Sequence, residues 1–155
     1  MTGARFDSSA DTLRHIRRVD ELLIQLATDL LERVGQHDYS KLEEPEKALF
    51  DEFTPKLRDS TYGSDEYKGF LAEMGAALQH HYEHNRHHPE HYSNGVDGMT
   101  LTDLAEMLAD WKAAGERHAD GDMAKSLTVQ RERFGLSDQL FSILENTARE
   151  AGWLT

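Results

Sequence analysis

Histidines gather in one short stretch of this sequence. Six of the nine histidines fall within the twelve residues from His80 to His91. Imidazole is the commonest metal-binding side chain and titrates near neutral pH, so such a cluster favours a metal site. A purification tag is excluded, because the run is internal and is interrupted by Tyr, Asn, Glu and Pro. Two interpretations remain: a tract that binds metal loosely or has no role, and a built site with partners elsewhere in the chain.

A histidine–aspartate doublet supplies the first candidate partner. In His37-Asp38 the carboxylate could bridge two cations while the imidazole binds one of them. Lys41 follows three residues later, where its ammonium could hold an anionic substrate group against the metal and so take part in catalysis. The alternative is an Asx turn followed by an ordinary surface lysine.

The second candidate partner is the acidic face of a predicted helix. Asp103, Glu106 and Asp110 recur at helical spacing, away from an expected buried stripe of Leu101, Leu104, Leu108 and Trp111. We expect Asp103 to be solvated. Asp110 is a candidate metal ligand that could project into a cleft between helices. Glu106, one turn earlier, could orient a ligand or act as a catalytic base.

If the histidine cluster is helical, its side chains divide between two faces. His81 and His88 share one face and His80 and His87 the next, and both faces cannot point into one pocket. We therefore predict that His81 and His88 bind metal. His80 and His87 are predicted to bind a second metal or the substrate, and His84 and His91 to be surface residues. Further candidates for binding phosphate, each with an ordinary solvated role as its alternative, are Arg18, Arg86 and Lys112.

Composition limits the chemistry of the site. The chain has 155 residues, a formal net charge of −12 and no cysteine. Thiolate zinc sites, disulfides and cysteine nucleophiles are therefore excluded. Nitrogen and oxygen ligands favour Mn, Fe, Zn, Co, Ni or Mg, with one or two ions. The acidic balance argues against non-specific binding to nucleic acid or to an anionic membrane. Without a signal segment or membrane span, we expect a cytoplasmic protein.

Hydrophobic periodicity predicts an all-α fold, a single-domain bundle of five to six helices over residues 1–155. The first helix should run from Asp11 to Val34, with Ser8 or Ser9 as N-cap and Gly35 as its stop. The second should begin at Pro45 and end at Pro55. The third should open at Ser64 or Asp65 and continue to about His87 or His88, where Pro89 stops it.

Three more helices complete the prediction. Thr100 and Asp103 form a capping-box pattern that opens a fourth helix, Leu101 to Ala114, closed by Gly115. The last two helices are expected at about Met123 to Phe134 and Ser137 to Ala151.

The order of these residues resembles the HD-domain superfamily of metal-dependent phosphohydrolases. The residues that show the resemblance are, in chain order, His15, His37-Asp38 with Lys41, His80-His81 and Asp110. The resemblance implies a helical domain in which a first-helix histidine, the doublet and the late aspartate bind metal, and in which extra histidines add a second ion. The His-Asp-x-x-Lys form is similar to that of HD-GYP phosphodiesterases and of HD-type di-iron oxygenases.

More narrowly, the chain resembles an uncharacterised, phage-enriched family of small proteins. The shared signatures are His-Asp-x-Ser-Lys, Tyr62-Gly63-Ser64-x-Glu-Tyr, His-His-Pro-Glu-His and Asp110-Trp111-Lys112. This resemblance covers nearly the whole chain but implies no activity.

His15 departs from the HD pattern. In a straight first helix, His15 would lie 22 residues, or roughly 33 Å, from His37, too far for both to bind one ion. Either the helix is interrupted, or His15 lies outside this site. His15 could also face the site of a second subunit, which leaves a homodimer open.

Three functions are compatible with these patterns. The leading hypothesis is a metal-dependent phosphohydrolase that acts on a small phosphorylated molecule, preferably a nucleotide. No serine nucleophile motif or glycine-rich phosphate loop competes with it. The alternatives are an HD-type di-iron oxygenase, and a metal-stabilised phage protein that binds a host protein without catalysis.

Overall fold

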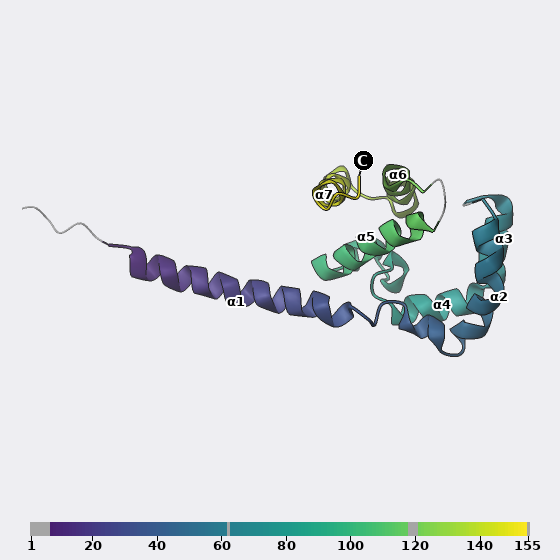
Figure 1. The fold of residues 1–155 in the computed structure, drawn as a ribbon, viewed down its shortest axis with the longest axis horizontal. Helices are drawn as coiled ribbons and strands as arrows, with labels where there is room; N and C mark the ends of the chain where they lie inside the picture. Colours follow the sequence, from purple (N-terminus) through teal and green to yellow (C-terminus); the bar gives the residue numbers. More distant parts are fainter. Residues whose placement is uncertain (1–6, 62, 118–120, 155) are drawn as a thin grey trace, which may run out of the picture. The chain divides into compact units, whose positions relative to one another are not determined.

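A computed structural model describes residues 7–61, 63–117 and 121–154 of the chain, so that Tyr62 lies outside the described residues. Seven α-helices, three short 3₁₀ helices and no strand occur in this part of the chain, which confirms the all-α prediction with more helices than expected. In chain order the elements are α1 (Ser9–Arg33), η1 (Tyr39–Leu42), α2 (Glu46–Asp59), α3 (Asp65–Glu73), α4 (Gly75–His84), η2 (Pro89–His91), η3 (Gly95–Gly98), α5 (Leu101–Glu116), α6 (Met123–Phe134) and α7 (Asp138–Glu150) (Figure 1).

The chain divides into two compact units, residues 1–36 and residues 37–155. In its described part, the first unit consists of helix α1 and the short segments that flank it. Its bounds agree with the predicted helix: Ser8 is the N-cap, and Gly35 follows the helix with a φ of 81°, a conformation that glycine adopts without strain.

Helix α2 begins at Glu46, one residue later than predicted, with Pro45 as its N-cap, and it continues through Pro55 to Asp59. Pro55 removes one backbone donor, a cost that more often ends a helix. Here Phe53, two residues before the proline, is buried and packs against Phe70 of α3, with 6.1 Å between the ring centres. Burial of such an aromatic ring contributes more than one backbone hydrogen bond, so the helix continues.

The predicted third helix is divided and ends early. Ser64 caps α3 by accepting a hydrogen bond from the Tyr67 amide, and the helix breaks at Met74 before α4 begins. Helix α4 ends at His84 rather than at His87 or His88. The reason is Asn85, whose side-chain Nδ2 donates to the His81 carbonyl at 2.8 Å. This bond replaces the one that the next backbone amide would make, so the backbone at Asn85 becomes extended.

Helices α5, α6 and α7 enclose the larger core of the second unit. Met107 and Trp111 of α5, Leu127 of α6 and Leu144 of α7 are buried together in it. Helix α6 has the predicted bounds, whereas α7 begins after its N-cap, Ser137, and ends one residue before the predicted Ala151.

The start of α5 corrects two predictions. The capping box of Thr100 and Asp103 is present, and the helix continues through Gly115 to Glu116. Leu101, expected to be core, is 75% exposed, whereas Asp103, expected to be solvated, is completely buried. Asp103 Oδ2 accepts hydrogen bonds from the Thr100 amide at 2.8 Å and from the Tyr92 hydroxyl at 2.7 Å. These donors, together with Arg86, compensate the carboxylate for its loss of water.

No helix in the described part of the chain is both long and apolar enough to cross a membrane.

Candidate metal centre

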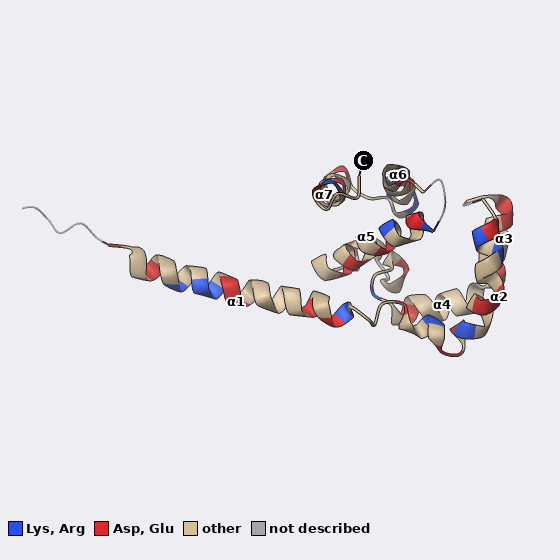
Figure 2. Ribbon diagram, viewed as in Figure 1, with Lys and Arg blue, Asp and Glu red and all other residues tan. Residues whose placement is uncertain are grey.

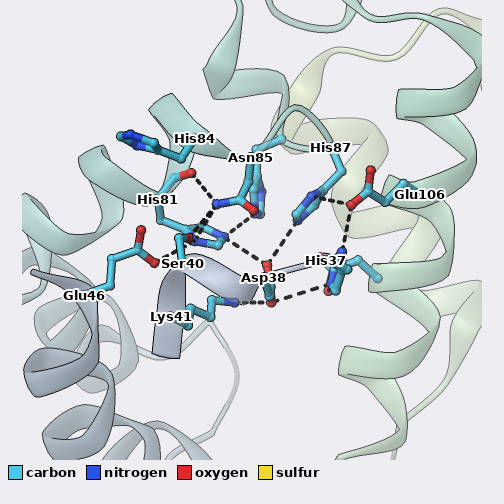
Figure 3. Close-up of polar contacts among 12 residues, drawn as sticks. His37, Asp38, Ser40, Lys41, Glu46, His81, His84, Asn85, His87 and Glu106 are labelled. Atoms are coloured by element: carbon cyan, nitrogen blue, oxygen red, sulfur yellow. Dashed lines mark hydrogen bonds and ion pairs between the residues drawn. The ribbon is translucent and has the colours of Figure 1, made fainter. Parts of the chain in front are cut away.

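The histidine–aspartate doublet lies in the turn that leads into η1. Asp38 caps η1 with a φ of 59° and is the one non-glycine residue with a positive φ in the described residues. Aspartate tolerates this left-handed conformation better than most side chains. The turn directs the Asp38 carboxylate toward histidines from α4 and from the segment that follows it (Figure 3).

Three imidazoles and one carboxylate form the best-enclosed group of possible metal ligands: Asp38, His81, His87 and His88. Asp38 Oδ1 lies 3.1 Å from His81 Nε2 and 3.4 Å from His87 Nε2. His81 Nε2 lies 3.0 Å from His88 Nε2. Ligand atoms around a tetrahedral ion bound at about 2.0–2.1 Å are roughly 3.3 Å apart, so these separations fit one ion.

Two atoms of this group support the same interpretation. Among the described residues, Asp38 Oδ1 and His87 Nε2 are buried side-chain atoms that make no hydrogen bond of good geometry, although Asp38 Oδ1 lies within ion-pair distance of His81 and His87. A buried polar atom without a good hydrogen bond costs free energy, and a role as a metal ligand is one of the few explanations for it. The ligand atoms therefore fit a metal ion both in their chemistry and in their spacing.

Glu46, the first residue of α2, fixes the orientation of His81. Glu46 is completely buried and His81 is 1% exposed. Glu46 Oε2 lies 2.9 Å from His81 Nδ1, and Glu46 Oε1 lies 2.7 Å from His80 Nδ1. Burial alone would raise the pKa of Glu46, but hydrogen bonds from His80, Ser40 and His81 lower it, so the carboxylate accepts. Because Glu46 holds the proton on Nδ1, Nε2 is the nitrogen through which His81 would bind an ion.

Glu106 of α5 does the same for two other histidines. Its Oε1 lies 2.9 Å from His37 Nδ1 and 3.1 Å from His87 Nδ1 (Figure 3). Both Nδ1–H groups can donate to this oxygen, which directs both Nε2 atoms toward Asp38. Glu106 also forms a possible ligand group with His37 and His87, and its predicted roles, in orienting ligands or as a catalytic base, stay predictions.

A second possible ligand group shares Asp38 and contains His37 and Asp110. His37 Nε2 lies 3.6 Å from Asp38 Oδ2 and 3.5 Å from Asp110 Oδ1. The Lys41 ammonium contacts the same Asp38 Oδ2 at 2.5 Å, and the Phe50 ring lies beneath it. A fixed cation at this oxygen opposes a second ion there, so the group on Oδ1 should fill first.

The charges of the metal-free site follow from these contacts. Hydrogen bonds to Asp110 and Glu106 raise the pKa of His37 to about 10 against the opposing effect of burial. Burial lowers the pKa of His88 to about 3, with help from the charges of His87 and His81, so the imidazole of His88 is neutral at pH 7. Burial would raise the pKa of Asp38, yet His81, His87 and Lys41 together hold it well below its usual range.

Three predicted substrate-binding residues have partners outside the two groups. His80 stacks on His84, with 4.0 Å between ring centres, besides its bond to Glu46. Arg86 donates to both carboxylate oxygens of Asp103, and Lys112 pairs with Glu116 at 3.2 Å. The structure does not place these residues on the Asp38 carboxylate.

His15 and Arg18 belong to the first unit, and their position relative to the site is not defined. Arg18 pairs with Glu21 on its own helix at 2.6 Å.

His87 corrects the argument from helical spacing. His81 and His87 were expected on different faces, but His87 follows the end of α4 and reaches the same carboxylate oxygen as His81. Glu46 was not predicted as a site residue. Acidic residues are common in the first turn of a helix, so this glutamate has no feature in the sequence that sets it apart. Ser40, which accepts from Asn85 Nδ2 at 2.8 Å, had a signal in the His-Asp-x-Ser-Lys signature.

The fold and site define an all-helical protein with a buried histidine–carboxylate group that could hold a metal ion. The chain belongs to DUF5662, a family of unknown function, whose model matches residues 4–150. Searches of curated proteins and of solved structures found no match. Membership of this family assigns no activity, so function has to be inferred from the chemistry of the site.

Proposed function

We propose that this protein is a metal-dependent phosphohydrolase that acts on a small phosphorylated molecule, with nucleotides as the preferred class. Asp38, His81, His87 and His88 would hold the ion. A bound divalent ion supplies a water of lowered pKa and polarises a phosphoryl oxygen. Nitrogen and oxygen ligands suit Mn, Fe, Zn, Co or Ni.

The observation that carries the proposal is the ammonium group of Lys41 beside the carboxylate that would bind metal. At a site that only stores a metal or uses it to stabilise the fold, a fixed cation would weaken binding, because it repels the metal ion. For an anionic substrate, in contrast, the Lys41 ammonium would neutralise part of the negative charge and so favour binding. Phe50 limits the freedom of the ammonium, which lies 5.0 Å from the centre of its ring.

His37 supplies a second group suited to a phosphoryl oxygen. Because its pKa is raised to about 10, it carries a proton on both ring nitrogens at pH 7 in the metal-free protein. The Nδ1–H donates to Glu106, which leaves the Nε2–H on the side of Asp38 and Asp110. A donor there and the Lys41 ammonium together favour negative charge on a bound substrate.

The direct test combines metal analysis with turnover. The full chain, purified after growth with added transition metals, is analysed for its elements and assayed for phosphate release from a panel of nucleotides and small phosphoesters. We expect at least one transition-metal ion per chain and release from at least one substrate. Asp38→Ala should lose both, whereas His84→Ala, a control on the exposed side of α4, should keep both.

The other outcomes separate the alternatives. Iron content with oxygen-dependent colour changes and no phosphate release would replace the proposal by an HD-type oxygenase. A fully loaded metal site without turnover would instead favour a metal-stabilised binding protein. Absence of metal from the purified and reconstituted protein would remove the basis of all three.

A further inference from the structure

Helix α1 has a continuous apolar stripe that its own unit cannot bury. Ile16, Val19, Leu23, Leu26 and Leu30 alternate at spacings of three and four residues, and all five side chains are exposed. This spacing is that of the a and d positions of a heptad repeat, which form the seam of a coiled coil. In the described residues 7–36 there is no second helix, so nothing within this unit covers the stripe.

Charge is segregated along the same helix. The first half, up to Arg18, contains Arg14, Arg17 and Arg18 against one acid, Asp11. The second half contains four acids, Asp20, Glu21, Asp29 and Glu32, against Arg33 alone (Figure 2). Two parallel copies of this helix would place like charges side by side, whereas two antiparallel copies would place each basic half beside an acidic half.

Two residues make this complementarity specific. Arg18 and Asp29 are eleven residues apart, close to three full turns, so they lie on the same side of the apolar stripe, with Asp29 next to it and the longer Arg18 side chain slightly farther round the helix. In an antiparallel pair the same edges of the two helices face each other. Arg18 of one copy then meets Asp29 of the other, twice in each pair. Within α1, Arg18 pairs with the exposed Glu21 at 2.6 Å and Asp29 with the partly buried Arg33 at 3.5 Å, and pairs of this kind along one helix contribute little.

We propose that α1 is a self-association element, which pairs antiparallel with α1 of a second copy of this chain through the apolar stripe. The helix is 25 residues, or roughly 37 Å, long, which gives the stripe more than three heptads. A membrane surface is a less suitable partner for the apolar stripe of α1. Helices that lie on membranes carry Lys and Arg on the polar face, but α1 has five acids, four arginines and no lysine.

The first experiment measures the mass of the full chain in solution, by light scattering after size exclusion, over a wide range of concentration. We expect a dimer. Leu23→Glu should raise its dissociation constant on the order of a hundredfold, because both copies place a charge in the apolar seam. Gln25→Glu, a matched change on the polar face of α1, should leave the constant within about twofold. Circular dichroism establishes that both variants remain helical.

Charge exchange and a distance then test the orientation. Arg18→Asp and Asp29→Arg should each weaken the dimer, and the double variant should restore it. Because the chain has no cysteine, Ser9→Cys provides a unique site for a spin label. In an antiparallel pair the two labels lie near opposite ends of the roughly 37 Å helix, and in a parallel pair they lie together.

Four results would overturn the proposal: a monomer at every concentration, a dimer that Leu23→Glu does not weaken, labels close together, or binding to anionic phospholipid vesicles that displaces the dimer. A monomer would mean that no second copy covers the stripe, and vesicle binding would mean that the stripe serves a membrane.

Discussion

Glu46 Oε2 and His81 Nδ1 lie 2.9 Å apart between two side chains that are almost completely buried. A carboxylate in this position decides which nitrogen of the imidazole is available to an ion. Through this hydrogen bond the first turn of α2 orients one member of the possible ligand group of Asp38, His81, His87 and His88. Glu46 itself belongs to none of the possible ligand groups.

This relationship predicts the effect of removing the Glu46 charge. Glu46→Gln should lower metal affinity about ten- to a hundredfold, because the amide can present its nitrogen to His81 and no longer selects one tautomer. Titration of the metal-free protein with Zn²⁺ or Co²⁺ measures the change. Glu44→Gln, an exposed neighbour with the same change of charge, is the control and should bind as the wild type does. Equal affinities in all three proteins would show that Glu46 has no orienting role.

The number of protons released on metal binding should indicate which of the possible ligand groups bind an ion. Asp38 and Glu106 raise the pKa of His87 against the effect of burial, so His87 must lose a proton to bind an ion. An ion in the Oδ1 group should therefore release protons, and an ion that also engages His37 should release about one more. Calorimetry at neutral pH in buffers of different ionisation enthalpy gives this number.

The sign of the pH dependence follows from the same pKa values. A raised pKa means that protons compete with the metal, so affinity should fall as pH falls. Without metal, the raised pKa of His37 stabilises the fold fully below about pH 6.5, and this contribution is lost as pH rises through about 10. Metal affinity that is constant between pH 6 and 8 would contradict protonation of His87 in the metal-free site.

Lys41 separates catalysis from metal storage. Lys41→Ala should retain metal, yet lower kcat/KM about ten- to a hundredfold, equivalent to roughly 1.5–3 kcal/mol, through loss of a charged contact to substrate. Lys47→Ala removes the same group from an exposed pair with Asp51 and should have no effect. Full activity in Lys41→Ala would leave its pairing with Asp38 as a structural contact and would remove the main argument for an anionic substrate.

The buried carboxylate of Asp103 should be a large contributor to stability. Asp103→Ala takes the acceptor away from the Tyr92 hydroxyl and the Thr100 amide, with an expected loss of about 2–4 kcal/mol in the free energy of unfolding. Urea denaturation measures it, with the exposed Asp97→Ala as control at about 0.5 kcal/mol or less. A small loss in Asp103→Ala would show that water replaces the carboxylate in this network.

Local chemistry explains why several helices could be predicted from sequence. Ser8 and Gly35 bound α1, and Thr100 with Asp103 opens α5, because caps depend on residues within a few positions of the helix end. The early end of α4 could not be predicted in this way. It depends on the rotamer of Asn85, in which the side chain donates to the His81 carbonyl and not to water.

Tertiary partners explain the remaining differences. Asp103 is buried because Tyr92 and Arg86 reach it from a preceding loop, and helical periodicity contains no information about them. Within the site, residue type and spacing pointed to Asp38, His81 and His88, which the structure brings together. His87 was assigned to another face because the pattern was interpreted as one continuous helix.

The end of α4 has a consequence for motion. The Asn85 side chain both closes this helix and holds Ser40 beside His81, so unwinding of the last turn would carry His81 away from the other ligands. An ion that binds only the closed state reduces the population of the open one by a factor set by its affinity. Hydrogen exchange of the last amides of α4 should therefore slow on addition of metal, whereas the amides of α7, which carries none of the ligands, should exchange as before.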